Sequence, residues 1–158
     1  MNWWDAIPGS GLTVRPAIID DVGRVIDAMS MDTFLQHFEH QTGKQARLAS
    51  ERWYVECTHQ FAIERETGGV VYLVTMFPLP AGYDIRGMMW GLPGVEFPRY
   101  AGRVAHWLRR RFLAHARQHG MVPLATAIAE TVENERWLRA CGGEPGEING
   151  RPVMMWGR

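Results

Sequence analysis

The chain has no net charge, only two cysteines and no long apolar run, and each of these bears on its class of function. Its 158 residues carry 17 basic and 17 acidic side chains, so the zero net charge argues against a surface built throughout to bind nucleic acid. Its two cysteines, Cys57 and Cys141, form no CxxC pair; this fits a reducing compartment, although a disulfide between them stays open. No apolar run approaches the roughly 18 residues of a membrane span, and residues 1–11 lack the pattern of a signal peptide. We therefore expect a cytoplasmic protein with no membrane partner.

The motifs of several enzyme classes are missing as well. The chain has no Walker phosphate loop, and none of its serines stands in a nucleophile-elbow pattern. His37 and His40 have a spacing that shares one helix face, but two ligands do not make a metal site and the sequence places no third. We expect no bound metal.

What the chain does contain is the composition of one folded domain. Hydrophobic residues make up 46% and charged residues 22%, which is typical of a globular protein. We expect a domain over residues 12–158, preceded by an N-terminal extension over residues 1–11. The seven tryptophans and nine methionines indicate a bulky core or an aromatic surface that meets a partner. Trp3 and Trp4 would anchor the extension in a groove or dock it on another chain.

Periodicity divides the first half of the chain into helices and a hairpin. A short strand over residues 12–15 precedes a helix with Asp20 and Asp21 in its first turn, where carboxylates favour the positive end of the dipole. A helical stretch over residues 32–56 is interrupted near Thr42 and Gly43. Two β-rich runs, 61–65 and 70–77, flank Gly68–Gly69 and predict a hairpin. A third strand is expected over residues 84–90, ended by the segment 91–94.

The second half predicts one long helix and a smaller α/β unit. Residues 99–119 place an apolar stripe at steps of three or four residues, formed by Val104, Ala105, Leu108, Phe112 and Ala116. A strand over 123–128, a short helix with residues 134–138, a glycine stop at 142–143 and a hairpin turning at Asn149–Gly150 follow. The sequence predicts an α/β (α+β) fold with a mostly antiparallel, twisted central sheet flanked by helices.

This order of elements, with the opening Thr13-Val14-Arg15-Pro16-Ala17 and the acids at 20–21, resembles the GCN5-related N-acetyltransferase (GNAT) superfamily. The resemblance covers almost the whole chain. It implies acetyl-CoA as cosubstrate and an amine as acceptor, with acetyl-CoA bound where the fourth strand leads into the long helix. The family's loop there reads Gln/Arg-x-x-Gly-x-Gly/Ala, and its N–H groups and the helix start hold the pyrophosphate.

The nearest match to that loop runs from Arg99 to Val104. The resemblance makes Arg99, Gly102, Arg103 and Val104 candidate cofactor-binding residues. Val104 stands where Gly or Ala is expected and would crowd the phosphates. The alternative is that Gly102 is simply a glycine near the start of a helix. It adds backbone N–H groups of the fourth strand, from Met88 through Met89 and Trp90, as donors to the thioester carbonyl.

The later family positions depart from the pattern. Aligned on Gly142, Thr131 replaces the usual Asn, Gly143 replaces Phe, and Leu138 replaces the Tyr that protonates the departing thiolate; Leu138 has no proton to give. The string Arg136-Trp137-Leu138-x-x-x-Gly142 resembles GNAT-related proteins of tailed bacteriophages, among them the internal virion protein group of T7-like phages.

Catalysis needs a base for the amine, and the family places a carboxylate on or beside the fourth strand. Asp84 and Glu96 are the candidates, each of which is otherwise an ordinary surface charge. Tyr100 is a candidate proton donor that can also stack on adenine, and Tyr83 is a second donor by residue type alone.

The long helix is strongly basic. Between residues 99 and 119 it carries six arginines and three histidines and no acid, so it would attract CoA phosphates, an acidic protein or nucleic acid, or be a solvated face whose acids lie on neighbouring elements. We see no interleaved exposed aromatics and expect no nucleic-acid partner.

Two functions follow from the sequence. The first is a GNAT-like acyl-CoA-dependent N-acetyltransferase with a degenerate active site, acting on an amine acceptor in the cytoplasm of a bacterial or phage-infected cell. The second is a catalytically inactive GNAT-fold structural or interaction protein that contacts other protein subunits, such as a bacteriophage virion or host-takeover protein. Fold alone does not decide between them.

Overall fold

The computed structural model describes residues 7, 9–128 and 132–157, so Trp3, Trp4 and Thr131 lie outside the described residues. Its strands are hydrogen-bonded in the order β1-β2-β3-β4-β5-β7-β6. The pairs β1–β2, β5–β7 and β6–β7 are antiparallel and β4–β5 is parallel, as the sequence predicted for a mostly antiparallel sheet.

Contacts between residues divide the chain into two compact units. Unit 1 consists of Met1–Thr75 and Gly91–Tyr100, and unit 2 of Met76–Trp90 and Ala101–Arg158. Strands β3 (Val70–Pro78) and β4 (Gly87–Pro93) and helix α4 (Phe97–Trp107) each have residues in both units.

Unit 1 begins with the strand that carries the opening motif. β1 (Leu12–Pro16) pairs with β2 (His59–Arg65) from Leu12↔Arg65 to Pro16↔Phe61. The turn from β2 to β3 uses Gly68 and Gly69 at φ of 94° and 96°, a left-handed backbone that glycine adopts without strain. The predicted Gly-Gly hairpin is therefore confirmed.

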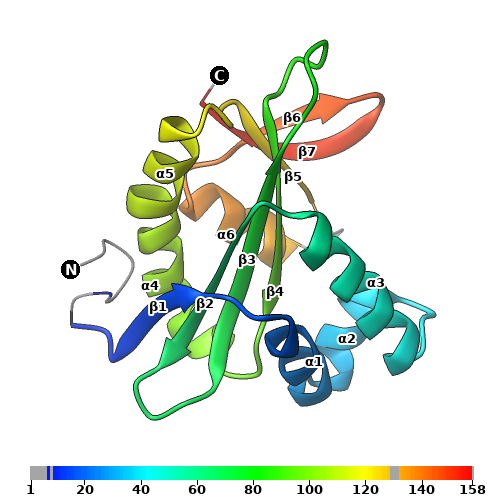
Figure 1. The fold of residues 1–158 in the computed structure, drawn as a ribbon, viewed down its shortest axis with the longest axis vertical. Coiled ribbons are helices and arrows are strands. Elements are labelled where there is room, and N and C mark those ends of the chain that lie inside the picture. Colours follow the sequence, from blue (N-terminus) through cyan, green and yellow to red (C-terminus); the bar gives the residue numbers. More distant parts are fainter. Residues whose placement is uncertain (1–6, 8, 129–131, 158) are drawn as a thin grey trace. The chain divides into compact units, whose positions relative to one another are not determined.

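The helices of unit 1 start where polar side chains cap them. α1 (Ile19–Ala28), α2 (Met31–Phe38) and α3 (Gly43–Glu56) follow one another in blue and cyan in Figure 1. Ser30 Oγ accepts from the Thr33 N–H at the start of α2, and Thr42 and Gln45 form a reciprocal capping box at the start of α3. The interruption expected near Thr42 and Gly43 is the boundary between α2 and α3.

The opening motif holds a buried ion pair. The Asp21 carboxylate, fully buried, accepts hydrogen bonds from both terminal nitrogens of Arg15 at 2.8 Å and from the Ile18 N–H at 2.8 Å. Arg15 also lies 3.1 Å from Glu64 on β2. One carboxylate therefore ties β1 to α1 and satisfies a free donor at the helix start.

The third strand of the predicted meander lies further along the chain than expected. β4 spans Gly87–Pro93, so Asp84 precedes it and residues 91–93 belong to it. Gly91 and Pro93 read as a break in sequence. The strand continues because Leu92 is buried and because the Tyr72 hydroxyl occupies the space beside Gly91, where a Cβ would come within 2.0 Å of it.

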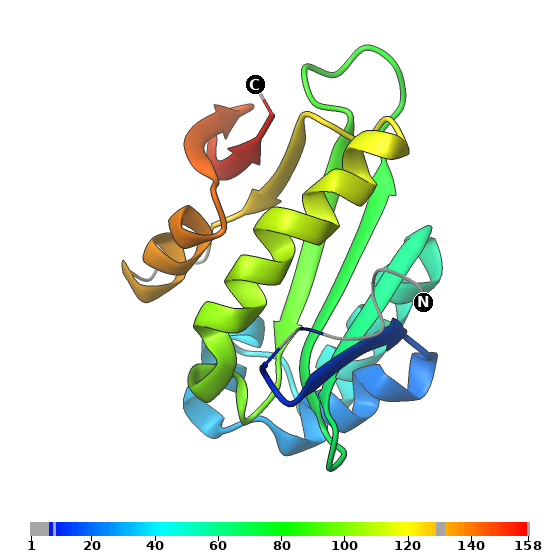
Figure 2. The same ribbon diagram turned by 90° about the vertical axis from the view of Figure 1, so that its left-hand side faces the viewer.

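Unit 2 carries most of the long helix, which contains a π turn. α4 is followed by η1 (Leu108–Phe112, π-helical) and α5 (Leu113–Gln118), and Figure 2 shows the three as one continuous rod. The predicted apolar stripe is buried throughout. Its residues Val104, Leu108, Phe112 and Ala116 are spaced by four, so an ideal helix would rotate the stripe away from the core. The π turn absorbs that drift.

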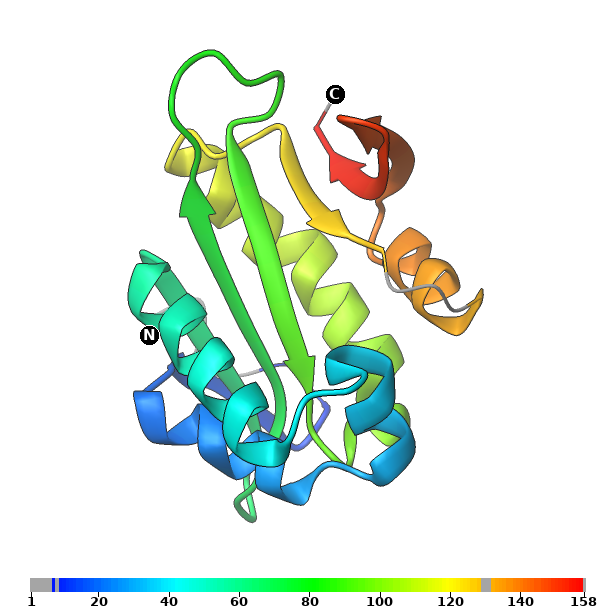
Figure 3. The same cartoon turned by 90° about the vertical axis from the view of Figure 1, so that its right-hand side faces the viewer.

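The rest of unit 2 follows the predicted order. β5 (Leu124–Ala127), α6 (Val132–Ala140), β6 (Glu144–Ile148) and β7 (Arg151–Trp156) succeed one another in Figure 3. Asn149 and Gly150 adopt φ of 50° and 76°, which confirms the predicted tight turn between β6 and β7. Gly142, at φ 90°, ends α6 as expected.

Candidate functional site

Strands β4 and β5 form a fork in unit 2. They run parallel and pair at Gly87↔Leu124 and Met88↔Ala125 only. β4 continues past Met88, while the next residues of β5 pair with β7 on the other side, at Thr126↔Met154 and Ala127↔Val153. Among the described residues, the β5 edge that faces β4 has no strand partner beyond Ala125. Such an edge offers N–H and C=O groups to an extended ligand.

Met89 and Trp90 are the first residues of β4 beyond the last pair with β5. Met89 is buried and Trp90 is half-buried. Along β4, Gly87 and Met89 are buried, as expected for a strand with alternating faces. The next buried residue is Leu92 rather than Gly91, so the alternation shifts by one residue. A one-residue slip is what a β-bulge produces, and a bulge re-aims backbone groups. The donor role expected for this backbone stays a prediction.

Thr126 is a residue at the fork that the sequence analysis did not single out. It is the first residue of β5 beyond the last pair with β4, and only 9% of it is exposed. Its hydroxyl makes no hydrogen bond within the part of the chain that the structure describes. Its place beside the fork makes it a candidate contact for a ligand there. The only sequence signal was a polar residue inside an apolar strand.

The turn before α4 lies upstream of the matched motif. α4 begins at Phe97, so Arg99 to Val104 lie inside the helix and not in a loop as expected; the turn between β4 and α4 is Gly94–Glu96. The Phe97 N–H donates to the Gly94 carbonyl at 3.0 Å, the Arg99 N–H donates to the Glu96 carbonyl at 3.1 Å, and Pro98 has no N–H. The backbone donors at this helix start are therefore largely used.

The two remaining donors of the turn belong to Val95 and Glu96. Their N–H groups make no hydrogen bond within the described residues. Only glycine fits at position 94 of this turn, because a Cβ there would come within 2.1 Å of the Val70 carbonyl oxygen. An anion at this end of the helix would meet these N–H groups and the side chains of the first turns.

The matched motif residues separate by helix face. Arg99, Gly102 and Arg103 are exposed and share one face at spacings of three and four residues. A Cβ on Gly102 would meet nothing within 4 Å, so space for a ligand exists there. Val104 is fully buried and packs in the core, so it neither crowds a phosphate nor offers a binding surface. That expectation was wrong because the motif gives spacing without helix phase.

Tyr100 lies beside this face rather than on it. It is half-buried, and the Arg99 guanidinium carbon is 5.6 Å from the centre of its ring. An arginine at that distance makes a cation–π contact. Tyr100 thus helps to fix Arg99 at the exposed face of α4.

The two carboxylate candidates line separate hollows, one in each unit. Asp84 is exposed in the loop before β4 and lines a hollow of about 390 Å³ with Tyr83 and Glu147. Glu96 is half-buried and lines a hollow of about 170 Å³ in unit 1, with Arg15 and Arg24 among its neighbours.

Asp84 belongs to the same unit as the fork. Ile85, which follows it, packs in one apolar cluster with Ala125 and Met155, and Met88 packs against that cluster. Met88 and Ala125 are the last pair before the strands part. Asp84 is therefore the carboxylate candidate of the unit that holds the fork, and it precedes the paired residues of β4.

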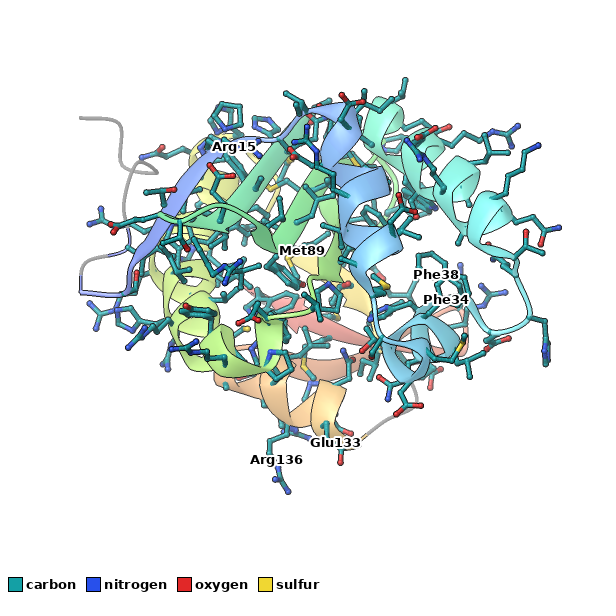
Figure 4. The ribbon with its side chains drawn as sticks, turned by 90° about the horizontal axis from the view of Figure 1, so that it is seen from below. Arg15, Phe34, Phe38, Met89, Glu133 and Arg136 are labelled. Atoms are coloured by element: carbon teal, nitrogen blue, oxygen red, sulfur yellow. The ribbon has the colours of Figure 1, made fainter. Side chains whose placement is uncertain are left out.

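Helix α6 does not provide a proton donor at the family's tyrosine position. Leu138 is buried in the core, and the neighbouring Trp137 indole N–H donates to the Ala101 carbonyl of α4 at 2.9 Å. Burial raises the pKa of the Cys141 thiol to about 12. The exposed side chains of α6 include Glu133 and Arg136, which project away from the helix in Figure 4.

Comparison with known proteins identifies the fold. No protein-family model and no curated protein sequence matches the chain. Solved structures do match over almost its full length. The aminoglycoside acetyltransferase AAC(6′)-Ib in complex with coenzyme A and kanamycin has a TM-score of 0.64 at 11% identity, covering 93% of this chain and 95% of that one.

Two further structures are similar to the same extent. A chimera of the spermidine N-acetyltransferase SpeG from Vibrio cholerae and hSSAT has a TM-score of 0.61 at 14% identity, covering 92% of this chain and 93% of that one. The ribosomal-protein-S5-alanine acetyltransferase from Vibrio fischeri has a TM-score of 0.56 at 11% identity, covering 92% and 91%. The chain has the GNAT fold expected from its sequence. No helix among the described residues is long and apolar enough to cross a membrane.

Proposed function

We propose that the chain is an acyl-CoA-dependent N-acetyltransferase whose acyl arm lies in the fork between β4 and β5. The fork carries the proposal, because two parallel strands that part after two residue pairs leave backbone groups for an extended ligand. The acetyltransferase names of the similar structures, one of them a complex with coenzyme A, support acetyl-CoA as cosubstrate and an amine as acceptor.

The reaction makes defined demands on these residues. The amine nitrogen attacks the thioester carbon, the C–S bond breaks, CoA leaves as a thiolate, and the amine proton goes to a base. The β4 backbone at Met89 and Trp90 would donate to the carbonyl oxygen. Asp84 is the base that we favour, since it is the carboxylate candidate of the unit that holds the fork. Glu96 and Tyr100 remain the alternative acid–base groups.

The cosubstrate's phosphates would lie at the start of α4. Arg99 and Arg103 supply positive charge on the exposed face, Gly102 leaves room between them, and the Val95 and Glu96 N–H groups add two backbone donors. Water would protonate the thiolate, because Leu138 has no proton to give.

A thermal shift with acetyl-CoA tests binding. A ligand present at about 100 times its dissociation constant adds roughly 2.7 kcal/mol of stability. We expect a shift for the wild type and for Gly102→Ala, because the added methyl group meets open space, and none for Gly102→Trp, which covers the phosphate approach. A Gly102→Trp variant that binds as well as Gly102→Ala would place the cosubstrate elsewhere.

Thiol release in the presence of an amine panel then tests catalysis. We expect turnover by the wild type and a large loss in Asp84→Asn. The alternative is a catalytically inactive GNAT-fold interaction protein, and the observation that favours it is the buried Leu138 at the family's tyrosine position. Wild-type protein that shows no thermal shift at millimolar acetyl-CoA would support that alternative against the enzyme.

A further inference from the structure

The neutral chain is electrically asymmetric. Unit 2 holds ten arginines against six acidic residues, a net charge of +4, and unit 1 holds seven basic residues against eleven acids, a net charge of −4. The six acids of unit 2 all lie outside the rod formed by α4, η1 and α5. The rod therefore concentrates positive charge that the total composition hides.

The arginines of this rod face solvent. Among them Arg110, Arg111 and Arg117 are exposed and take part in no ion pair within the described residues. Ion pairs elsewhere in the structure use Arg15, Arg24, Arg47 and Arg139. Within the described residues, no acid is paired with Arg110, Arg111 or Arg117.

The π turn contributes to this exposure. In an ideal α-helix continued from Leu108, Arg111 would turn toward the buried stripe and Leu113 away from it. The i→i+5 pattern of η1 delays the rotation, so Phe112 and Leu113 are buried while Arg109, Arg110 and Arg111 are all exposed. Figure 2 shows the rod from its side along its whole length.

The exposed face of the rod lacks the apolar and aromatic side chains that a protein, a membrane surface or a single-stranded nucleic acid would contact. A specific protein interface is built on aromatic or apolar anchors, and a membrane-surface helix needs an exposed apolar face. The exposed positions among and between these arginines are His106, Ala114 and Gln118, and no large hydrophobic side chain of the rod is exposed. Stacking on single-stranded bases needs aromatics as well.

A phosphate backbone needs none of these anchors. Arginine forks bind phosphate oxygens in bidentate fashion, and neutralising phosphates releases counterions without reading any base. The eight residues from Arg110 to Arg117 span about 10 Å of helix, which matches about three phosphates at 3.4 Å per strand. The zero net charge excludes a surface that is basic throughout, and the lack of exposed aromatics on this face excludes stacking on single-stranded bases. Neither observation bears on contacts to the backbone of a duplex.

We propose that the outer face of η1 and α5, formed by Arg110, Arg111 and Arg117, binds the phosphate backbone of a nucleic-acid duplex without sequence preference. This interaction surface goes beyond the proposed acetyltransferase function and does not depend on it. It would hold the chain near a nucleic acid or near proteins assembled on one.

The test is the salt dependence of duplex binding, measured by fluorescence anisotropy with the full chain and a 20-base-pair duplex. The double variant Arg110→Ala/Arg117→Ala removes two of the proposed contacts. Its matched control, Arg86→Ala/Arg151→Ala, removes two exposed arginines of the same unit that lie off the rod. Each phosphate contact contributes about 0.9 to the slope of log K against log salt.

We expect the wild type to bind in low salt, the slope to fall by about 1.8 in the rod variant, and the control to keep the wild-type slope. Equal slopes in the two double variants would overturn the proposal, as would no binding by the wild type at about 100 µM protein in low salt. Displacement of the duplex by polyglutamate at matched charge would instead assign the face to an acidic protein. An unchanged acetyl-CoA shift in the rod variant would show that this surface and the fork are independent.

Discussion

Replacing Asp21 by Asn should destabilise the protein strongly although it alters no residue of the fork. The Asp21 carboxylate is fully buried and accepts three hydrogen bonds of 2.8 Å, two from Arg15 and one from the Ile18 N–H. Asn would keep the shape but turn an N–H₂ group toward arginine donors and leave the guanidinium charge without its partner. Breaking a buried pair costs about 3–5 kcal/mol, and we take about 3 because Arg15 is partly hydrated.

The assay is urea unfolding followed by circular dichroism. With an m-value of about 2 kcal/mol per molar, a loss of about 3 kcal/mol lowers the midpoint by about 1.5 M. The control is Arg24→Ala, which removes a 3.8 Å contact to the same carboxylate from an arginine that is 66% exposed. Exposed pairs contribute less than about 1 kcal/mol, so the control should move the midpoint by less than about 0.5 M.

The pH dependence gives a second readout of the same pair. Burial alone would raise the pKa of Asp21, but the hydrogen bonds from Arg15 and the Ile18 N–H and the arginine charge outweigh it and hold that pKa below its usual value. Such a group stabilises the fold fully above its unfolded pKa of about 3.9 and loses that contribution as the pH falls through the folded value. The gap between wild type and Asp21→Asn should therefore be constant near neutral pH and close below about pH 4. A midpoint shift under about 0.5 M at pH 7 would refute the reasoning.

Most of the fold was readable from local signals. The Gly68–Gly69 and Asn149–Gly150 turns need left-handed backbone, and the structure has it at all four residues. The boundary at Thr42 was visible because a capping box starts there. These features depend on neighbouring residues alone, which explains why the sequence predicted them.

The misplaced strand depended on a residue far away in sequence. Gly91 and Pro93 look like strand breakers when read locally. Tyr72, on another strand, places its hydroxyl where a side chain at position 91 would stand, so a glycine inside β4 is required there. No local pattern reports such a contact.

The π turn, in contrast, left a trace in the sequence. Apolar residues at 104, 108, 112 and 116 are spaced by four, whereas a stripe on an ideal helix must alternate threes and fours. Steps of three or four residues predict a helix but do not by themselves reveal this drift. The consequence is functional, because the corrected register exposes three consecutive arginines.

The site was harder to predict than the fold. The motif match gave the right helix but placed Val104 at a phosphate, whereas the structure buries it. The fork forms where β4 and β5 stop pairing, and the whole long helix lies between these strands in the sequence. Local sequence patterns contain no information on the register of such distant strands. Thr126 became a candidate only after that pairing was known.

Two further predictions concern a buried thiol and the glycines at the start of α4. Cys141 is 1% exposed and its pKa is raised to about 12 by burial, so iodoacetamide at pH 8 should label it only as fast as the protein unfolds; labelling of native protein at the rate of a free thiol would contradict this. Gly94→Ala and Gly102→Ala should have opposite effects on stability, although the chemical change is the same. At Gly94 the new methyl group meets the Val70 carbonyl oxygen at 2.1 Å and forces the backbone apart, at a cost of about 1–3 kcal/mol or more. At Gly102 it meets open space on an exposed helix and should add about 0.5–1 kcal/mol. Urea midpoints that move in the same direction for both variants would show that the turn before α4 is not held as tightly as these distances require.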